Sequence, residues 1–156
     1  MGDPTPWMAE PTLTWLGWLL DSYRDRLGSD LLPRSADPLE QAAIVFAAPR
    51  VVVSHRLSDD PILCYGNQVA LDLWEMSWDQ LTAIPSRLTA EADARGERAR
   101  MLEAARIQGY YRPYEGVRVS ARGRRFRIED AVIWNVSNDR GERIGQAASF
   151  ERWTFL

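Results

Sequence analysis

The chain has a single histidine, and carboxylates follow it closely. His55 ends a β-branched run, and Asp59 and Asp60 come a few residues later. A histidine acting as a general base needs a nucleophile and an orienting carboxylate nearby. A haem-ligating histidine would instead have to face a large apolar pocket. We favour a simpler interpretation, in which His55 lies at a strand end and bonds to the backbone of the following turn.

Aromatic and polar side chains recur where a small sheet and its helices would enclose a cavity. Small-molecule pockets have mostly apolar walls and a few polar groups. The same aromatic side chains could instead fill this space as a core, and the sequence leaves both alternatives open. The candidates for lining the cavity are His55, Tyr65, Asn67, Trp74, Trp78, Arg87, Tyr110, Tyr114, Asp130, Trp134 and Gln146.

Composition limits the class of protein. A length of 156 residues with 46% hydrophobic residues fits one folded domain. The longest apolar run, residues 42–48, is far too short to cross a bilayer, and the N-terminus does not resemble a secretory signal. A net charge of -3 argues against a general nucleic-acid binder, and one cysteine excludes an internal disulfide. We therefore expect a cytoplasmic protein with neither nucleic acid nor membrane as a partner.

The N-terminal region contains one amphipathic helix. Prolines make residues 1–11 a loose leader, a helical stripe runs from Thr12 to about Leu27, and Gly28 can end it. Residues 29–38 form a linker, so we divide the chain into residues 1–38 and a domain of residues 39–156. Two tryptophans make the stripe wide enough to cover a sheet or to form a homodimer, and we expect a homodimer. The interface candidates are Leu13, Trp15, Leu16, Trp18, Leu19, Leu20 and Tyr23.

The middle of the chain alternates between helices and strands. A helix starts at Asp37 or Pro38 and ends before Pro49, and strands follow at residues 51–56 and 62–65. Asn67 is a good N-cap for the next helix, because its side-chain oxygen can accept from a free N–H of the first turn. A longer charged helix is expected from Ala92 to Gln108.

The last third of the chain alternates as a sheet does. Strands are expected at residues 116–120, 124–136 and 143–153, joined by tight turns. In the long middle strand, the apolar residues from Phe126 to Val136 are expected to share one face. Asp130 would then lie on that apolar face, so we expect either a bulge nearby or a polar pocket contact.

Several separated segments are similar to the MEKHLA domain family, which is related to the PAS fold. They are Ile62–Glu75, Pro85–Glu91, Gly116–Ser120, Gly123–Phe126 and Trp153–Leu156. The likeness covers roughly residues 39–156, although the name-giving peptide cannot occur in a chain without lysine. The family is found as small stand-alone bacterial proteins and at the C-terminus of plant homeodomain–leucine zipper regulators. The resemblance implies a sensory or regulatory domain and brings no established catalytic residues.

The expected fold is therefore α+β, with a PAS-like five-stranded antiparallel sheet, helices on one face and an extra N-terminal helix on or beside the other. The expected function is sensing or regulation, through a small molecule or a protein partner. We expect no output domain in this length, so the signal would pass to a separate partner or through a change in oligomeric state.

The sequence does not identify a cofactor, and neither haem at His55 nor flavin at Cys64 is the favoured interpretation. Some PAS relatives form a flavin–cysteine adduct at a cysteine in a polar Asn-Cys-Arg context, whereas Cys64 lies between Leu63 and Tyr65 in an apolar strand. Two other classes remain open. A small enzyme would need a titratable pair such as His55 with Asp130 or Glu115, and a pure interaction module would need a filled core.

Overall fold

The computed structural model describes residues 5–89 and 95–156. The expected helix start at Ala92 lies outside this part of the chain. In the described part, no helix has both the length and the apolarity needed to cross a bilayer. The elements are η1 (Pro6–Met8), α1 (Glu10–Leu27), α2 (Pro38–Phe46), β1 (Val51–Arg56), β2 (Leu63–Gly66), α3 (Gln68–Trp74), α4 (Trp78–Leu81), η2 (Ser86–Thr89), α5 (Arg95–Gln108), β3 (Tyr110–Val119), β4 (Arg125–Ser137), β5 (Arg143–Phe150) and β6 (Arg152–Phe155).

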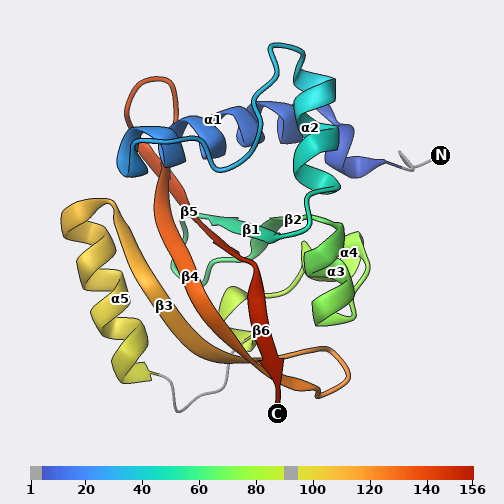
Figure 1. Cartoon of the computed structure of the whole chain (residues 1–156), viewed down its shortest axis with the longest axis vertical. Coiled ribbons are helices and arrows are strands. Elements are labelled where there is room, and N and C mark those ends of the chain that lie inside the picture. The colour runs from blue at the N-terminus through green and yellow to red at the C-terminus, as the bar shows by residue number, and fades with distance from the viewer. Residues whose placement is uncertain (1–4, 90–94) are drawn as a thin grey trace.

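The strands form an antiparallel sheet in the order β2-β1-β5-β4-β3, and β6 pairs with β4 (Figure 1). The sequence predicts five strands, with one closing strand over residues 143–153. The structure divides that strand at Glu151. Both parts keep the same register against β4, so β6 continues β5 beyond an interruption opposite Asp130.

Asp130 interrupts the sheet because its backbone is left-handed. Its φ is 53°, and the pairing of β3 with β4 shifts register between Tyr114 and Gly116. This confirms the expected bulge. The expectation of one shared apolar face is wrong, because the bulge reverses the alternation along β4. Phe126 and Ile128 therefore pack with α3 on one side of the sheet, whereas the later residues Val132, Trp134 and Val136 pack under α1 on the other.

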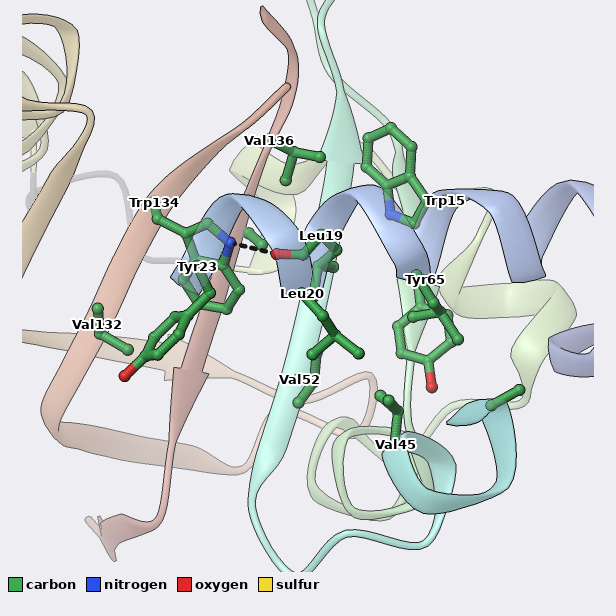
Figure 2. Close-up of a cluster of buried hydrophobic side chains, with 13 residues drawn as sticks. Trp15, Leu19, Leu20, Tyr23, Val45, Val52, Tyr65, Val132, Trp134 and Val136 are labelled. Atoms are coloured by element: carbon green, nitrogen blue, oxygen red, sulfur yellow. Dashed lines mark hydrogen bonds between the residues drawn. The ribbon is translucent and has the colours of Figure 1, made fainter. Parts of the chain in front are cut away.

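Helix α1 lies across one face of the sheet, and its indole contacts fix its position (Figures 1 and 2). Trp15 Nε1 donates to Ser54 Oγ at 2.8 Å, and Trp134 Nε1 donates to the Leu19 carbonyl at 3.0 Å. Gly145 of β5 allows this close approach, because a Cβ there would lie 2.6 Å from Trp15 Cη2. The helix is thus seated on the strands by both packing and hydrogen bonds.

Most of the apolar stripe of α1 is buried against other elements of its own chain. The buried members Trp15, Leu16, Leu19, Leu20 and Tyr23 pack on the sheet and on α2, as Figure 2 shows for several of them. Only Leu13 and Trp18 remain partly exposed. Covering the sheet therefore explains the width of the stripe, and the buried members cannot face a partner while α1 stays in place.

The Asn67 amide joins α2, β1 and α3. Its side chain is fully buried, and Oδ1 accepts from Ala70 N at 3.3 Å and from Val52 N at 3.0 Å. Nδ2 donates to the carbonyls of Val45 at 3.1 Å and Arg50 at 2.7 Å. The predicted N-cap is confirmed, and the same amide also satisfies backbone groups of two neighbouring elements.

Replacing Asn67 by alanine should destabilise the fold by about 3 kcal/mol or more, because several buried backbone groups lose their partner at once. Ser77→Ala is the matched control. Ser77 only closes the capping box of the short helix α4, and losing that cap costs about 1 kcal/mol. Urea unfolding followed by circular dichroism measures both. Equal losses for the two variants would show that Asn67 acts as a cap and nothing more.

Candidate ligand-binding cavity

A cavity of about 340 Å³ lies between the second face of the sheet and the helices α3 and α5. Its middle is apolar, with Val53, Ala148 and Ile133 from three adjacent strands and Met101 from α5. The polar lining residues gather toward two ends. A largely apolar enclosure with a few polar groups has the general character of a small-molecule site.

One end of the cavity is lined by Trp74, Tyr114 and Arg118. Trp74 is 3% exposed, and its Nε1 has no hydrogen-bond partner within the described residues. Arg118 donates from Nη2 to Tyr114 Oη at 2.9 Å and from Nη1 to the Val117 carbonyl at 3.2 Å. Since Tyr114 Oη accepts from Arg118, its own proton remains available for donation.

Gly116 makes room for the contact between Tyr114 and Arg118. The three residues alternate along β3 and share one face. A Cβ at Gly116 would lie 2.6 Å from Tyr114 Oη and 2.9 Å from Arg118 Nη1. The glycine is therefore needed for space, because its backbone is not in the left-handed region.

The other end of the cavity carries His55 and Gln146, with Asn135 beside them. These residues are direct cross-strand partners on β1, β5 and β4 and so share one face. Asn135 Nδ2 donates to the Ala105 carbonyl at 2.9 Å, which leaves its Oδ1 as a buried acceptor without a partner in the described chain. Gln146 Nε2 is a buried donor that likewise has no partner in the described chain. Arg143 lies at this end as well, and burial lowers its guanidinium pKa, with Arg26 adding to the effect.

The C-terminus of α3 is tied to the turn between β3 and β4. The Trp74 carbonyl accepts from Ala121 N at 2.9 Å. Glu75 has a left-handed backbone with φ 56°, and its Oε2 accepts from Ser120 Oγ at 2.6 Å. The C-terminal end of α3, which carries Trp74, is thus linked to that turn by two hydrogen bonds.

The structure divides the predicted cavity residues into two groups. Those that line the cavity are His55, Trp74, Tyr114 and Gln146. Four aromatic residues lie instead in or against the core under α1, namely Tyr65, Trp78, Tyr110 and Trp134. Asn67 lies at its capping site. Arg87 and Asp130 lie on the surface, beside Asp60 and Arg152 respectively. Trp134 lies on the α1 side because the bulge at Asp130 reverses the alternation along β4, and Tyr65 lies on that side next to a register shift between β1 and β2.

Arg118 is the functional candidate that sequence reasoning missed. It was hidden among many surface arginines, and only its alternation with Gly116 and Tyr114 on one strand could have distinguished it. Asn135 was missed for a similar reason, because it lies in the middle of an apolar run. A search for a polar residue flanked by apolar ones on a predicted central strand would have found it.

The pairings of His55 with Asp130 or Glu115 are not assembled, whereas Asp59 lines the cavity together with His55. His55 pairs with Gln146 at one end of the sheet, whereas Asp130 lies at the other end and bonds to Arg152 at 3.0 Å. Glu115 is exposed and alternates with the cavity-facing Tyr114. Within the described residues, no group of three or more His, Cys, Asp or Glu side chains could hold a metal ion.

Cys64 lies away from the cavity, on the side covered by α1. Its Sγ is 3.6 Å from Ser54 Oγ, and burial raises the pKa of the thiol. A thiol in this position is a poor nucleophile. Cys64 lines a separate groove with Thr12 and Trp78 and not the cavity beneath α3 and α5.

Solved structures with the same arrangement of strands and helices are PAS domains. A PAS domain from Colwellia psychrerythraea superposes with a TM-score of 0.62 at 16% identity, covering 77% of this chain and 98% of that one. The PAS domain of a LuxR-family transcriptional regulator from Burkholderia thailandensis, solved in complex with ethanol, gives 0.54 at 15% identity, covering 73% and 95%. The chain therefore has an α+β PAS-like fold.

The chain belongs to the MEKHLA domain family, whose model matches residues 13–155. The match takes in α1, which lies outside the range of residues 39–156 expected from sequence. The homeobox-leucine zipper protein ATHB-9 of Arabidopsis thaliana is 28% identical over 151 residues. That alignment covers 92% of this chain and 18% of the plant protein, so the likeness concerns one region of a much longer relative.

Tyr65→Phe should leave the free energy of unfolding at pH 7 unchanged or raise it by up to about 1 kcal/mol, because the buried Tyr65 hydroxyl has no partner in the described chain. Burial raises the Tyr65 pKa well above its usual value near 10. Only the unfolded state then loses this proton between the two pKa values, so stability should fall above about pH 10.

Tyr65→Phe should lack this part of the loss of stability at alkaline pH. Urea unfolding at pH 7 and near pH 10.5 measures the difference. Tyr23→Phe is the matched control, since Tyr23 packs edge-to-face on Trp134 but lines a polar surface groove. Clear destabilisation of Tyr65→Phe at pH 7 would mean that the hydroxyl makes a bond not seen here.

Proposed function

We propose that this chain is a cytoplasmic sensory domain that binds a small molecule in the cavity between the sheet and α3 and α5. The observation that carries the proposal is the pair of buried donors on the cavity wall, Trp74 Nε1 and Gln146 Nε2, without partners in the described chain. A buried polar group without a partner costs about 1–3 kcal/mol, and a ligand bearing acceptors would remove that cost.

The fold supports the same proposal. The family and the PAS-like architecture are those of sensory and regulatory domains, and one structural neighbour was solved with a small molecule. The competing enzyme interpretation loses its pairing of His55 with Asp130, because Asp130 lies on the surface beside Arg152. The competing filled-core module does not account for a cavity of about 340 Å³.

We propose that the domain passes its signal to a separate partner protein and that it also self-associates. Leu13 and Trp18 of α1 are the stripe residues still partly exposed, so a second copy would contact this part of the helix. The interface candidates of α1 that are buried against the sheet would contact a second copy only if the helix left the sheet.

Native mass spectrometry of untreated purified protein should detect a retained small molecule and report the oligomeric state together. Ala148→Phe should fill the middle of the cavity and remove the retained mass while the protein remains folded by circular dichroism. Ala43→Phe, at an exposed position of α2, is the matched control and should keep the ligand. If the native protein carries no added mass and binds no compound from a metabolite mixture, the sensory proposal fails.

A further inference from the structure

The cavity has different chemistry at its two ends, and this difference limits what it can bind. Gln146 and Phe150 both line it and lie four positions apart on β5, a span of about 13 Å. Phe150 packs against Trp74, so the Trp74 end and the Gln146 end are distinct. A volume of about 340 Å³ corresponds to roughly eleven water volumes at about 30 Å³ each, which suits a ligand of about ten non-hydrogen atoms.

The Trp74 end offers donors of hydrogen bonds. The Trp74 indole N–H has no partner among the described residues, the Tyr114 hydroxyl has a proton to donate, and Arg118 carries a guanidinium. No carboxylate of the described chain forms an ion pair with Arg118, whereas the arginines Arg50, Arg87 and Arg152 each have one. Among the described residues, this end of the cavity therefore has a positive side chain without an ion-pair partner and two neutral donors beside it, while the cavity's one described carboxylate belongs to Asp59.

The donors are held in place before any ligand arrives. The absence of a side chain at Gly116 lets Arg118 reach across to Tyr114, and Arg118 also bonds its neighbouring backbone carbonyl. The guanidinium stands 5.4 Å from the centroid of the Tyr114 ring. Such prior ordering reduces the entropy lost on binding.

We propose that the Trp74–Tyr114–Arg118 end of the cavity binds the carboxylate of a small acid whose remaining body is apolar. A carboxylate carries one charge and several acceptor sites, which match one guanidinium and two neutral donors. The apolar body lies against Val53, Ile133 and Ala148. A phosphate ester fits less well, because a dianion in an apolar cavity would need more than one cation beside it.

The inference rests on the proposed sensory function and specifies its ligand class. Calorimetric titration of the full chain with 3-phenylpropionate and octanoate, each beside its alcohol, tests it. At least one acid should bind at least tenfold more tightly than its alcohol. Arg118→Gln should reduce affinity for that acid at least tenfold and leave affinity for the alcohol unchanged.

Arg127→Gln is the matched control, because Arg127 is an exposed arginine on the neighbouring strand, paired with Val117. It should bind as the unmodified chain does. Gly116→Ala is a second variant, and its added methyl group should push Tyr114 and Arg118 apart and weaken acid binding selectively. Circular dichroism and urea unfolding confirm that each variant is folded.

The inference is overturned if the alcohols bind as tightly as the acids, if Arg118→Gln leaves acid binding unchanged, or if inorganic phosphate competes as well as the acids do. It is also overturned if neither acid binds. In each of these cases the sensory proposal is judged separately, because a neutral or phosphorylated molecule retained in the native mass spectrum would support it.

Discussion

The four hydrogen bonds of the Asn67 amide are the constraint on which the cavity depends. They fix the start of α3 relative to the end of α2 and the first residues of β1. Helix α3 is only seven residues long and has little propensity to persist alone. The position of Trp74, at the far end of that helix, is thus set by an asparagine that does not itself line the cavity.

The sheet packs against a separate hydrophobic core on each face, because the alternation of side chains along β4 reverses at Asp130. Residues before the bulge face α3, and from Val132 onward the even-numbered residues face α1. The same strand therefore anchors α1 through Trp134 and borders the cavity through Ile133. This arrangement lets the small chain bury an N-terminal helix and still keep an enclosed space on the opposite face.

Local sequence signals predicted the parts of the fold that depend on neighbouring residues. The helix start at Asp37 or Pro38, the cap at Asn67, the stop at Gly28 and the bulge near Asp130 all follow from residue type and spacing. The direction in which Tyr65 and Trp134 point was not predicted, because which face follows the bulge in β4 and the register shift between β1 and β2 is set by pairing between strands. Arg118 was missed because its role depends on an absent Cβ at Gly116.

The link between α3 and the turn after β3 gives the cavity a connection to the surface. The Trp74 carbonyl and the Glu75 carboxylate both bond to residues of that turn, so a shift of the C-terminal end of α3 would pull on Ala121 or Ser120. The turn also carries Arg122 and Arg124 on its exposed side. Binding of a molecule in the cavity would consequently alter the amide chemical shifts of this solvent-facing turn. Other molecules can contact the charged side chains of the same turn.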